Sequence, residues 1–202
     1  MDELIQTFVL MWAVIDPIGT VPVFIAVTRR HDPGQLPRIA CRAVAIAALI
    51  LVFFIVAGQI LLEAMDIPLS AFQIAGGIVL FIFSLTMIFG ESKPEEEIDM
   101  LQRSGETAVF PLAVPSIASP GAMMAVVLLT DNHRFSIFHQ MQTTGVILAV
   151  LAIQLLLLLL ARRILRVIGE SGASVVSRIM GLILASVAVT SVLNGIRGFF
   201  AF

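Results

Sequence analysis

Long apolar stretches alternate with short polar segments along the whole chain. A bilayer hydrocarbon core about 30 Å thick needs roughly 20 apolar residues of helix for each crossing. The stretches do not alternate apolar and polar residues in the way that strands of a membrane β-barrel do. The pattern therefore predicts six transmembrane helices, at approximately residues 4–28, 43–62, 69–90, 108–130, 142–161 and 178–200.

The composition agrees with this pattern. Hydrophobic residues make up 59% of the chain, charged residues only 13%, and the mean hydropathy is +1.05. So little polar surface cannot cover a water-soluble protein of 202 residues. We expect an all-α membrane protein with the lipid bilayer as its partner, and no nucleic-acid partner, metal or bound cofactor.

Lysine and arginine gather on one side of the predicted membrane domain. Cytoplasmic connections carry the excess of positive charge in membrane proteins, so the odd-numbered connections are assigned to the cytoplasm and both termini to the periplasmic side. The even-numbered connection and the last span carry Arg134 and Arg197. The odd-numbered connections and their flanks carry Arg29, Arg30, Arg38, Arg42, Lys93, Arg103, Arg162, Arg163, Arg166 and Arg178.

Similar residues recur in the two halves of the chain. Pro17 and Pro120 are 103 residues apart, and Gly76 and Gly181 are 105 apart. Each half contains three predicted spans, so the second half enters the membrane in the opposite direction. An inverted repeat of this kind is common in secondary transporters. The sequence predicts two inverted three-helix repeats, residues 1–90 and 108–202, joined by a charged cytoplasmic linker of residues 91–107, with a generic six-helix bundle as the alternative.

Proline and glycine cluster in the first and fourth spans, between residues 17 and 22 and between residues 111 and 121. Proline removes a backbone donor and clashes with the preceding helical turn. Unwound backbone at membrane depth occurs only where protein or a watery cavity surrounds it. We therefore predict that both spans are broken at mid-membrane and line a cavity between the repeats.

A broken helix presents amide groups on one side of the break and carbonyl groups on the other. The amides near Gly19, Thr20, Gly121 and Ala122 can hold a carboxylate. The carbonyls before the two prolines can receive an ammonium group or a cation. This pairing suits a zwitterion. The predicted substrate-binding residues are Asp16, Pro17, Gly19, Thr20, Ser116, Ser119, Pro120, Gly121 and Ala122.

Asp16 is the one carboxylate that the pattern places well inside a span, where ionisable groups are costly and mark functional sites. It can couple transport to a proton or a sodium ion. It can also cap the second half-helix by accepting hydrogen bonds from the amides of residues 18 and 19. Ser119 can provide the equivalent cap in the fourth span, and the two roles of Asp16 are compatible.

At these residues the sequence resembles the MarC family of bacterial and archaeal inner-membrane proteins. The first broken span, Asp16-Pro17-Ile18-Gly19-Thr20-Val21-Pro22-Val23-Phe24, is similar to the family's DP-x-G-N-x-P-x-F signature. The fourth, Pro111-Leu112-Ala113-Val114-Pro115-Ser116-Ile117-Ala118-Ser119-Pro120-Gly121-Ala122, is similar to P-L-A-x-P-x-x-x-G-P-G-A. The resemblance implies transport of small neutral amino acids such as glycine and alanine, coupled to a cation gradient. Thr20 and Ser119 depart from the family's usual Asn and Gly.

Together these features predict a secondary transporter of small neutral amino acids that works by alternating access. Because the predicted pocket has no second buried charge beyond Asp16, lysine, arginine and dicarboxylates are disfavoured as substrates. An exporter of drugs or other metabolites is the nearest alternative. A non-transporting membrane scaffold and an intramembrane enzyme are alternatives from other classes, although the spans offer one acid and no histidine. Gly181 and Ala185 permit a homo-oligomer contact.

Overall fold

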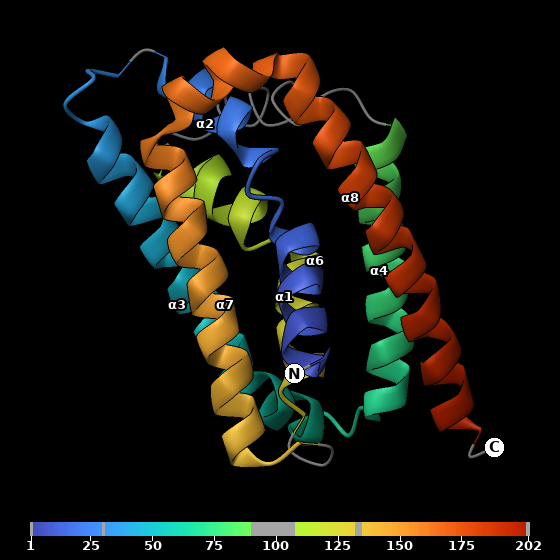
Figure 1. Cartoon of the computed structure of the whole chain (residues 1–202). Coiled ribbons are helices and arrows are strands. Elements are labelled where there is room, and N and C mark those ends of the chain that lie inside the picture. Colours follow the sequence, from blue (N-terminus) through green and yellow to red (C-terminus); the bar gives the residue numbers. More distant parts are fainter. Residues whose placement is uncertain (1, 30, 90–107, 132–134, 201–202) are drawn as a thin grey trace.

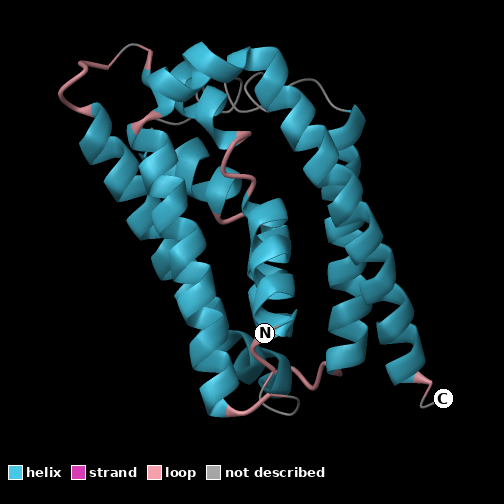
Figure 2. Cartoon of the chain, in the orientation of Figure 1, coloured by secondary structure: helices cyan, strands magenta, loops and turns pink. Residues whose placement is uncertain are grey.

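The computed structural model describes residues 2–29, 31–89, 108–131 and 135–200. These residues are helical apart from short turns, and no β-strand occurs among them (Figures 1 and 2). The all-α prediction is therefore confirmed for the described part of the chain. The predicted linker, residues 91–107, lies outside the described residues.

Proline and glycine divide the first predicted span into two helices, α1 (Asp2–Ile15) and α2 (Thr20–Thr28). The fourth predicted span is likewise divided, into a π-helix, η1 (Ala108–Ile117), and the short helix α6 (Pro120–Leu129). The predicted breaks in these two spans are therefore present. The other helices are α3 (Leu36–Ala64), α4 (Leu69–Phe89), α7 (Ile137–Leu159) and α8 (Ala161–Phe199).

Five helical segments of the described chain are long and apolar enough to cross a membrane. The α1–α2 pair counts as one of them, and α6 is a shorter apolar helix in addition. The fourth predicted span is absent from the five because η1 and α6 are each only 10 residues long. The structure thus agrees with a helical membrane protein.

Three helices are longer than the hydropathy pattern predicts. α3 begins at Leu36 instead of residue 43, α7 begins at Ile137, and α8 begins at Ala161 instead of residue 178. Arginine-containing turns can be helical where they leave the apolar layer, although they lower local hydropathy. α8 is interrupted at Gly169, whose φ of 71° and ψ of 168° are not helical and are readily adopted only by glycine, so the apolar helix that could cross a membrane begins at Ser171.

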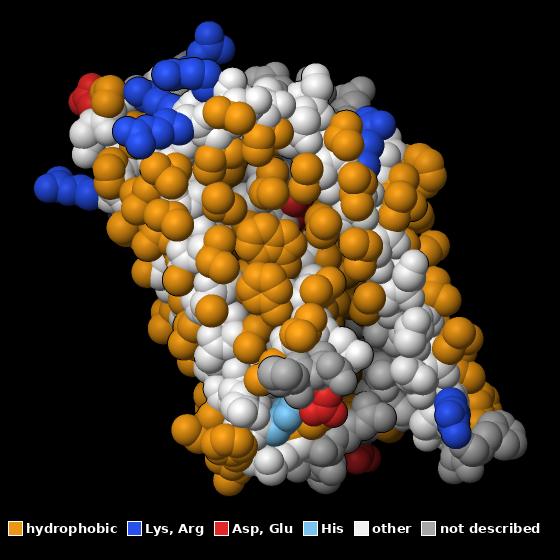
Figure 3. Space-filling view, in the orientation of Figure 1, with side chains coloured by type: hydrophobic (Ala, Val, Ile, Leu, Met, Phe, Trp, Pro, Cys, Tyr) orange, Lys and Arg blue, Asp and Glu red, His pale blue; other side chains and the backbone are white. Residues whose placement is uncertain are grey.

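Successive helical passes run in alternate directions between the two ends of the bundle (Figure 1). The start of α1 and the end of α8 lie at the same end. Hydrophobic side chains cover the middle of the face shown in Figure 3, and arginine side chains gather at the other end. This arginine-rich end contains the exposed residues Arg29, Arg38, Arg162, Arg163 and Arg166.

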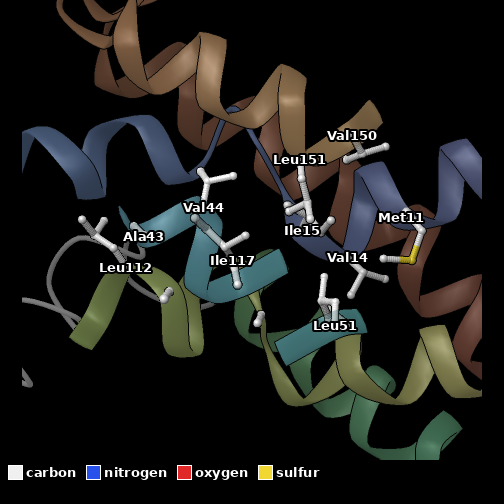
Figure 4. Packing of buried hydrophobic residues seen from close by; sticks show 14 of the residues in the cluster. Met11, Val14, Ile15, Ala43, Val44, Leu51, Leu112, Ile117, Val150 and Leu151 are labelled. Atoms are coloured by element: carbon white, nitrogen blue, oxygen red, sulfur yellow. The ribbon is translucent and has the colours of Figure 1, made fainter. Parts of the chain in front are cut away.

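The hydrophobic core lies where α1, α3, η1 and α7 meet (Figure 4). Met11, Val14 and Ile15 of α1 are fully buried, as is Leu51 of α3. Figure 4 shows Leu151 of α7 beside Ile15, at the point where α1 ends. This packing fixes the first break against three other helices.

Small residues bring α4 and α8 into close contact along their lengths. A Cβ atom on Gly77 would lie 2.8 Å from the carbonyl oxygen of Ala188. A Cβ atom on Gly181 would lie 3.1 Å from the carbonyl oxygen of Ser84. These glycines therefore permit close packing of α4 against α8 within the chain.

Candidate functional site

The first break is centred on Asp16, which directly follows α1. Its amide still donates a 3.0 Å hydrogen bond to the carbonyl of Trp12, as the next residue of α1 would. Its φ of 49° then turns the chain into the left-handed region, where aspartate is among the few side chains that occur repeatedly. The residue is 1% exposed. The chain therefore carries a carboxylate into the interior at the point where the helix stops.

The Asp16 carboxylate is held by hydrogen bonds from both sides. Oδ1 accepts a bond of 3.1 Å from the amide of Gly19, one of the two amides predicted, in the turn that precedes α2. Oδ2 accepts a bond of 2.8 Å from the hydroxyl of Ser177 in α8. The hydroxyl and the amide of Thr20 both donate to the carbonyl oxygen of Asp16, at 2.9 and 3.0 Å. One residue thus closes the α1–α2 break and connects it to α8.

Gly19 leaves the space that these bonds require. A Cβ atom at this position would overlap both the Asp16 carboxylate and the Ser177 hydroxyl. The backbone of Gly19 is in the ordinary right-handed helical region, with φ −67° and ψ −22°. Glycine is therefore required here by the close approach of α8 and not by backbone conformation.

The second break has a simpler cap. Ser119 is extended, with φ −69° and ψ 157°, and its hydroxyl accepts a 3.1 Å bond from the amide of Ala122. Pro120 occupies the first helical position, where its missing N–H costs nothing. The cap predicted for Ser119 is confirmed, and it places the first turn of α6 inside the bundle.

The two breaks lie together in the interior of the bundle (Figure 2). A Cβ atom on Gly121 would lie 3.7 Å from Val14, two residues before Asp16, and 2.7 Å from Leu80 of α4. In addition, α1 contacts α6, and α2 contacts η1. Of the predicted binding residues, Pro120 is exposed, and the buried ones are Asp16, Pro17, Gly19, Thr20, Ser116, Ser119, Gly121 and Ala122.

Most of the amides predicted to hold a carboxylate already have partners inside the chain. Those of Gly19 and Thr20 donate to Asp16, and that of Ala122 donates to Ser119. Gly121 belongs to the first turn of α6, whose amides have no carbonyl four residues earlier within the helix. In this conformation Gly121 is therefore the amide of the four best placed to receive a ligand.

Two buried polar side chains in this region make no hydrogen bond with any described residue. They are Ser116 in η1, through its Oγ, and Gln154 in α7, through both atoms of its amide. Gln154 is 0% exposed. It lies one helical turn beyond Leu151, which Figure 4 shows beside Ile15 at the end of α1. Buried polar groups normally have partners, so these two are available to a ligand.

Neither Ser177 nor Gln154 is among the site residues predicted from the sequence. Ser177 falls in the arginine-containing region before the predicted sixth span, which the hydropathy pattern treats as a connection. Gln154 was visible as the one polar residue before the run Leu155-Leu156-Leu157-Leu158-Leu159-Leu160. Its isolation among leucines was the signal that could have identified it.

A second carboxylate is buried outside the predicted spans. Asp131, just after α6, is 1% exposed, and its Oδ1 accepts a 3.3 Å bond from Nε2 of Gln59 in α3. The hydropathy pattern placed this residue in a connection, but the end of α3 covers it. This second polar contact lies at the end of the bundle opposite to the arginine-rich end.

The sequence matches known proteins along its whole length. The profile described as MarC family integral membrane protein matches residues 1–200. A membrane protein of Methanocaldococcus jannaschii is 36% identical over 197 residues, which is 96% of each chain. A membrane protein of Pyrococcus horikoshii is 36% identical over 99% of each chain. The inner membrane protein YhgN of Escherichia coli K12 is 30% identical over 98% of each chain.

No solved structure matched the chain. The family match covers both broken spans and the helices that pack on them, so the geometry described above belongs to the matched region. Apolar helices long enough to cross a membrane occupy most of the same residues. The chain belongs to the MarC family of integral membrane proteins.

Proposed function

We propose that the chain is a secondary transporter of small neutral amino acids, driven by a proton or sodium gradient. The proposal places it in the bacterial inner membrane, as in the name of the similar protein YhgN. Both termini lie on the periplasmic side in this proposal, because the arginine-rich end is at the opposite end of the bundle and arginine favours the cytoplasm.

An inverted repeat is part of the proposal, and the helix contacts support it. If α1, α2, α3 and α4 correspond to η1, α6, α7 and α8, most contacts occur in equivalent pairs. α3 contacts η1 and α7 contacts α1, while α3 contacts α6 and α7 contacts α2. The α4–α8 contact pairs with itself if Gly181 corresponds to Gly77 and not to Gly76. Gly77 approaches Ala188 and Gly181 approaches Ser84, and the members of each corresponding pair are then 104 positions apart.

The observation that carries the transport proposal is the position of Asp16. A carboxylate at membrane depth is energetically costly, so its presence there indicates a function. This one lies in a helix break and contacts α8, which belongs to the other proposed repeat, through Ser177. A proton or a sodium ion that binds the carboxylate competes for the lone pairs that now accept from Gly19 and Ser177. Ion binding is thereby coupled to the contact between the repeats.

The neighbouring polar groups suit a small zwitterion. The Gly121 amide and the Ser116 hydroxyl can donate to a substrate carboxylate, and the Gln154 amide can donate or accept. Carbonyl groups at the end of η1 can accept from an ammonium group. A neutral amino acid matches this set because it presents one group of each kind and needs no further buried charge.

Among the described residues, polar contacts connect the proposed repeats at different depths, and one of them joins Glu3 to His139 at 3.7 Å. Asp16 and Ser177 connect them at the first break, and Gln59 and Asp131 connect them at the end opposite to the arginine-rich end. Alternating access requires contacts of this kind to form in one state and separate in the other. We propose that the described conformation is closed at the Gln59–Asp131 end.

The proposal is tested by uptake of labelled glycine and alanine into proteoliposomes, under an imposed proton or sodium gradient, with protein-free liposomes as the control. Gradient-driven uptake above the control supports it. If neither amino acid enters under either gradient, thermal protection of the purified protein by a panel of neutral amino acids decides the matter. A transporter of such substrates is stabilised by at least one of them, and the absence of any stabilisation contradicts the proposal.

A further inference from the structure

A cavity of about 340 Å³ lies at the arginine-rich end, away from the helix breaks. It is formed by the end of α2, the segment that leads into α3, and the junction of α7 with α8. None of the residues around the two breaks lines it. The cavity is therefore a separate feature from the proposed transport site.

Three arginines line this cavity: Arg29, Arg162 and Arg163. All three are exposed, and their guanidinium groups make no ion pair with any residue that the structure describes. Asp32 lies in the same segment as Arg29 but does not line the cavity. Three like charges around one hollow attract an anion, and guanidinium groups match the geometry of phosphate oxygens.

The rest of the cavity is apolar. Phe24, Leu158 and Ala161 form buried walls, at 2%, 1% and 2% exposure. Leu159 and Leu160 also line it and are 48% and 36% exposed. The cavity therefore combines a positively charged part with an apolar part that continues to the outer surface of the helices. A soluble anion needs only the positively charged part.

We infer that this cavity binds the head group and upper acyl chain of an anionic phospholipid. The phosphate oxygens contact Arg29, Arg162 and Arg163, and the first methylene groups of an acyl chain lie along Leu159 and Leu160. The negative charge of the phosphate complements the arginines, and the acyl chain complements the apolar surface. Basic pockets at the cytoplasmic side of membrane helices are a recurrent site for such lipids.

Native mass spectrometry of the purified full-length protein tests this inference, with equal amounts of phosphatidylglycerol and phosphatidylcholine added. The wild type is expected to retain phosphatidylglycerol in preference to phosphatidylcholine. The loss of each arginine weakens retention about five-fold, so the R162Q/R163Q double variant loses about twenty-fold or more. The variant R162K/R163K retains part of the preference because it keeps the charge.

The matched control is Arg38→Gln, which removes a charge from the same end without altering the cavity. It should retain phosphatidylglycerol as the wild type does. Equal retention of the two lipids by the wild type overturns the inference, as does an equal loss in Arg38→Gln and in the double variant. Added inorganic phosphate separates a free anion from a lipid: if millimolar phosphate displaces all bound phosphatidylglycerol, the site recognises phosphate alone and the lipid assignment fails.

Discussion

Ser177 and Asp16 are 161 positions apart in the chain, and the Ser177 hydroxyl donates a 2.8 Å hydrogen bond to the Asp16 carboxylate. The bond connects the last long helix to the break in the first span. Because the carboxylate also caps the chain at Gly19, its protonation or its binding of a cation is expected to alter two contacts at once. This arrangement is the basis of the proposed coupling.

Ser177→Ala is expected to destabilise the protein by about 1.5–3 kcal/mol, since it removes a hydrogen bond to a buried charged group. Thermal unfolding in detergent measures the effect. Ser186→Ala is the matched control in the same helix, because the Ser186 side chain is exposed and its hydroxyl donates to the carbonyl of Leu182 in the same helix. Equal melting temperatures for the two variants would show that the Ser177 bond contributes nothing.

Gly19→Ala is expected to disrupt the first break, because the new methyl group overlaps the Asp16 carboxylate and the Ser177 hydroxyl. We expect a loss of at least about 1–3 kcal/mol of stability, as for other overpacked interiors. Gly145→Ala is the control: beyond the adjacent residues and backbone of its own helix, no described atom lies within 4 Å of the new methyl group, and alanine favours a helix. A Gly19→Ala protein as stable as wild type would contradict the described geometry.

Gln154→Leu separates ligand binding from folding. The substitution removes a buried amide that has no partner among the described residues, so the protein without substrate should be at least as stable as wild type. Substrate uptake and substrate protection against heat should both fall if the amide contacts the ligand. Gln142→Leu, at an exposed position of the same helix, should leave both unchanged. Normal uptake by Gln154→Leu would exclude this residue from the site.

The repeat proposal predicts matched effects at two glycines that are far apart in the sequence. Gly77→Val and Gly181→Val each insert a side chain against the backbone of the partner helix, at equivalent positions of the α4–α8 contact. Both should lower the melting temperature, and by similar amounts. A large effect at one position with none at the other would contradict the proposed equivalence.

The sequence predicted the helical class, both breaks and the two caps, because each depends on local chemistry. Proline interrupts a helix wherever it occurs in the interior, and Asp16 and Ser119 are typical capping residues three positions before the amides they accept from. Hydropathy also located the apolar spans, because the thickness of the hydrocarbon core sets how many consecutive apolar residues a crossing helix needs.

The remaining features depend on tertiary packing, which hydropathy does not record. Ser177 contacts Asp16 only because α8 extends beyond its apolar part, into turns that contain arginine. Asp131 is buried because the end of α3, with Gln59, covers it. The helix starts at Leu36, Ile137 and Ala161 were missed for the same reason. Polar turns lower the mean hydropathy of the segment without ending the helix.

The central claim is that the charge of Asp16, and not only its cap, drives transport. Gradient-driven uptake into proteoliposomes by Asp16→Asn tests it most directly, because asparagine caps helices as well as aspartate and also tolerates a positive φ. The account predicts that Asp16→Asn folds normally but loses gradient-driven uptake, while Asp16→Ala loses stability as well. Unchanged gradient-driven uptake by Asp16→Asn would contradict the account and reduce Asp16 to a structural cap.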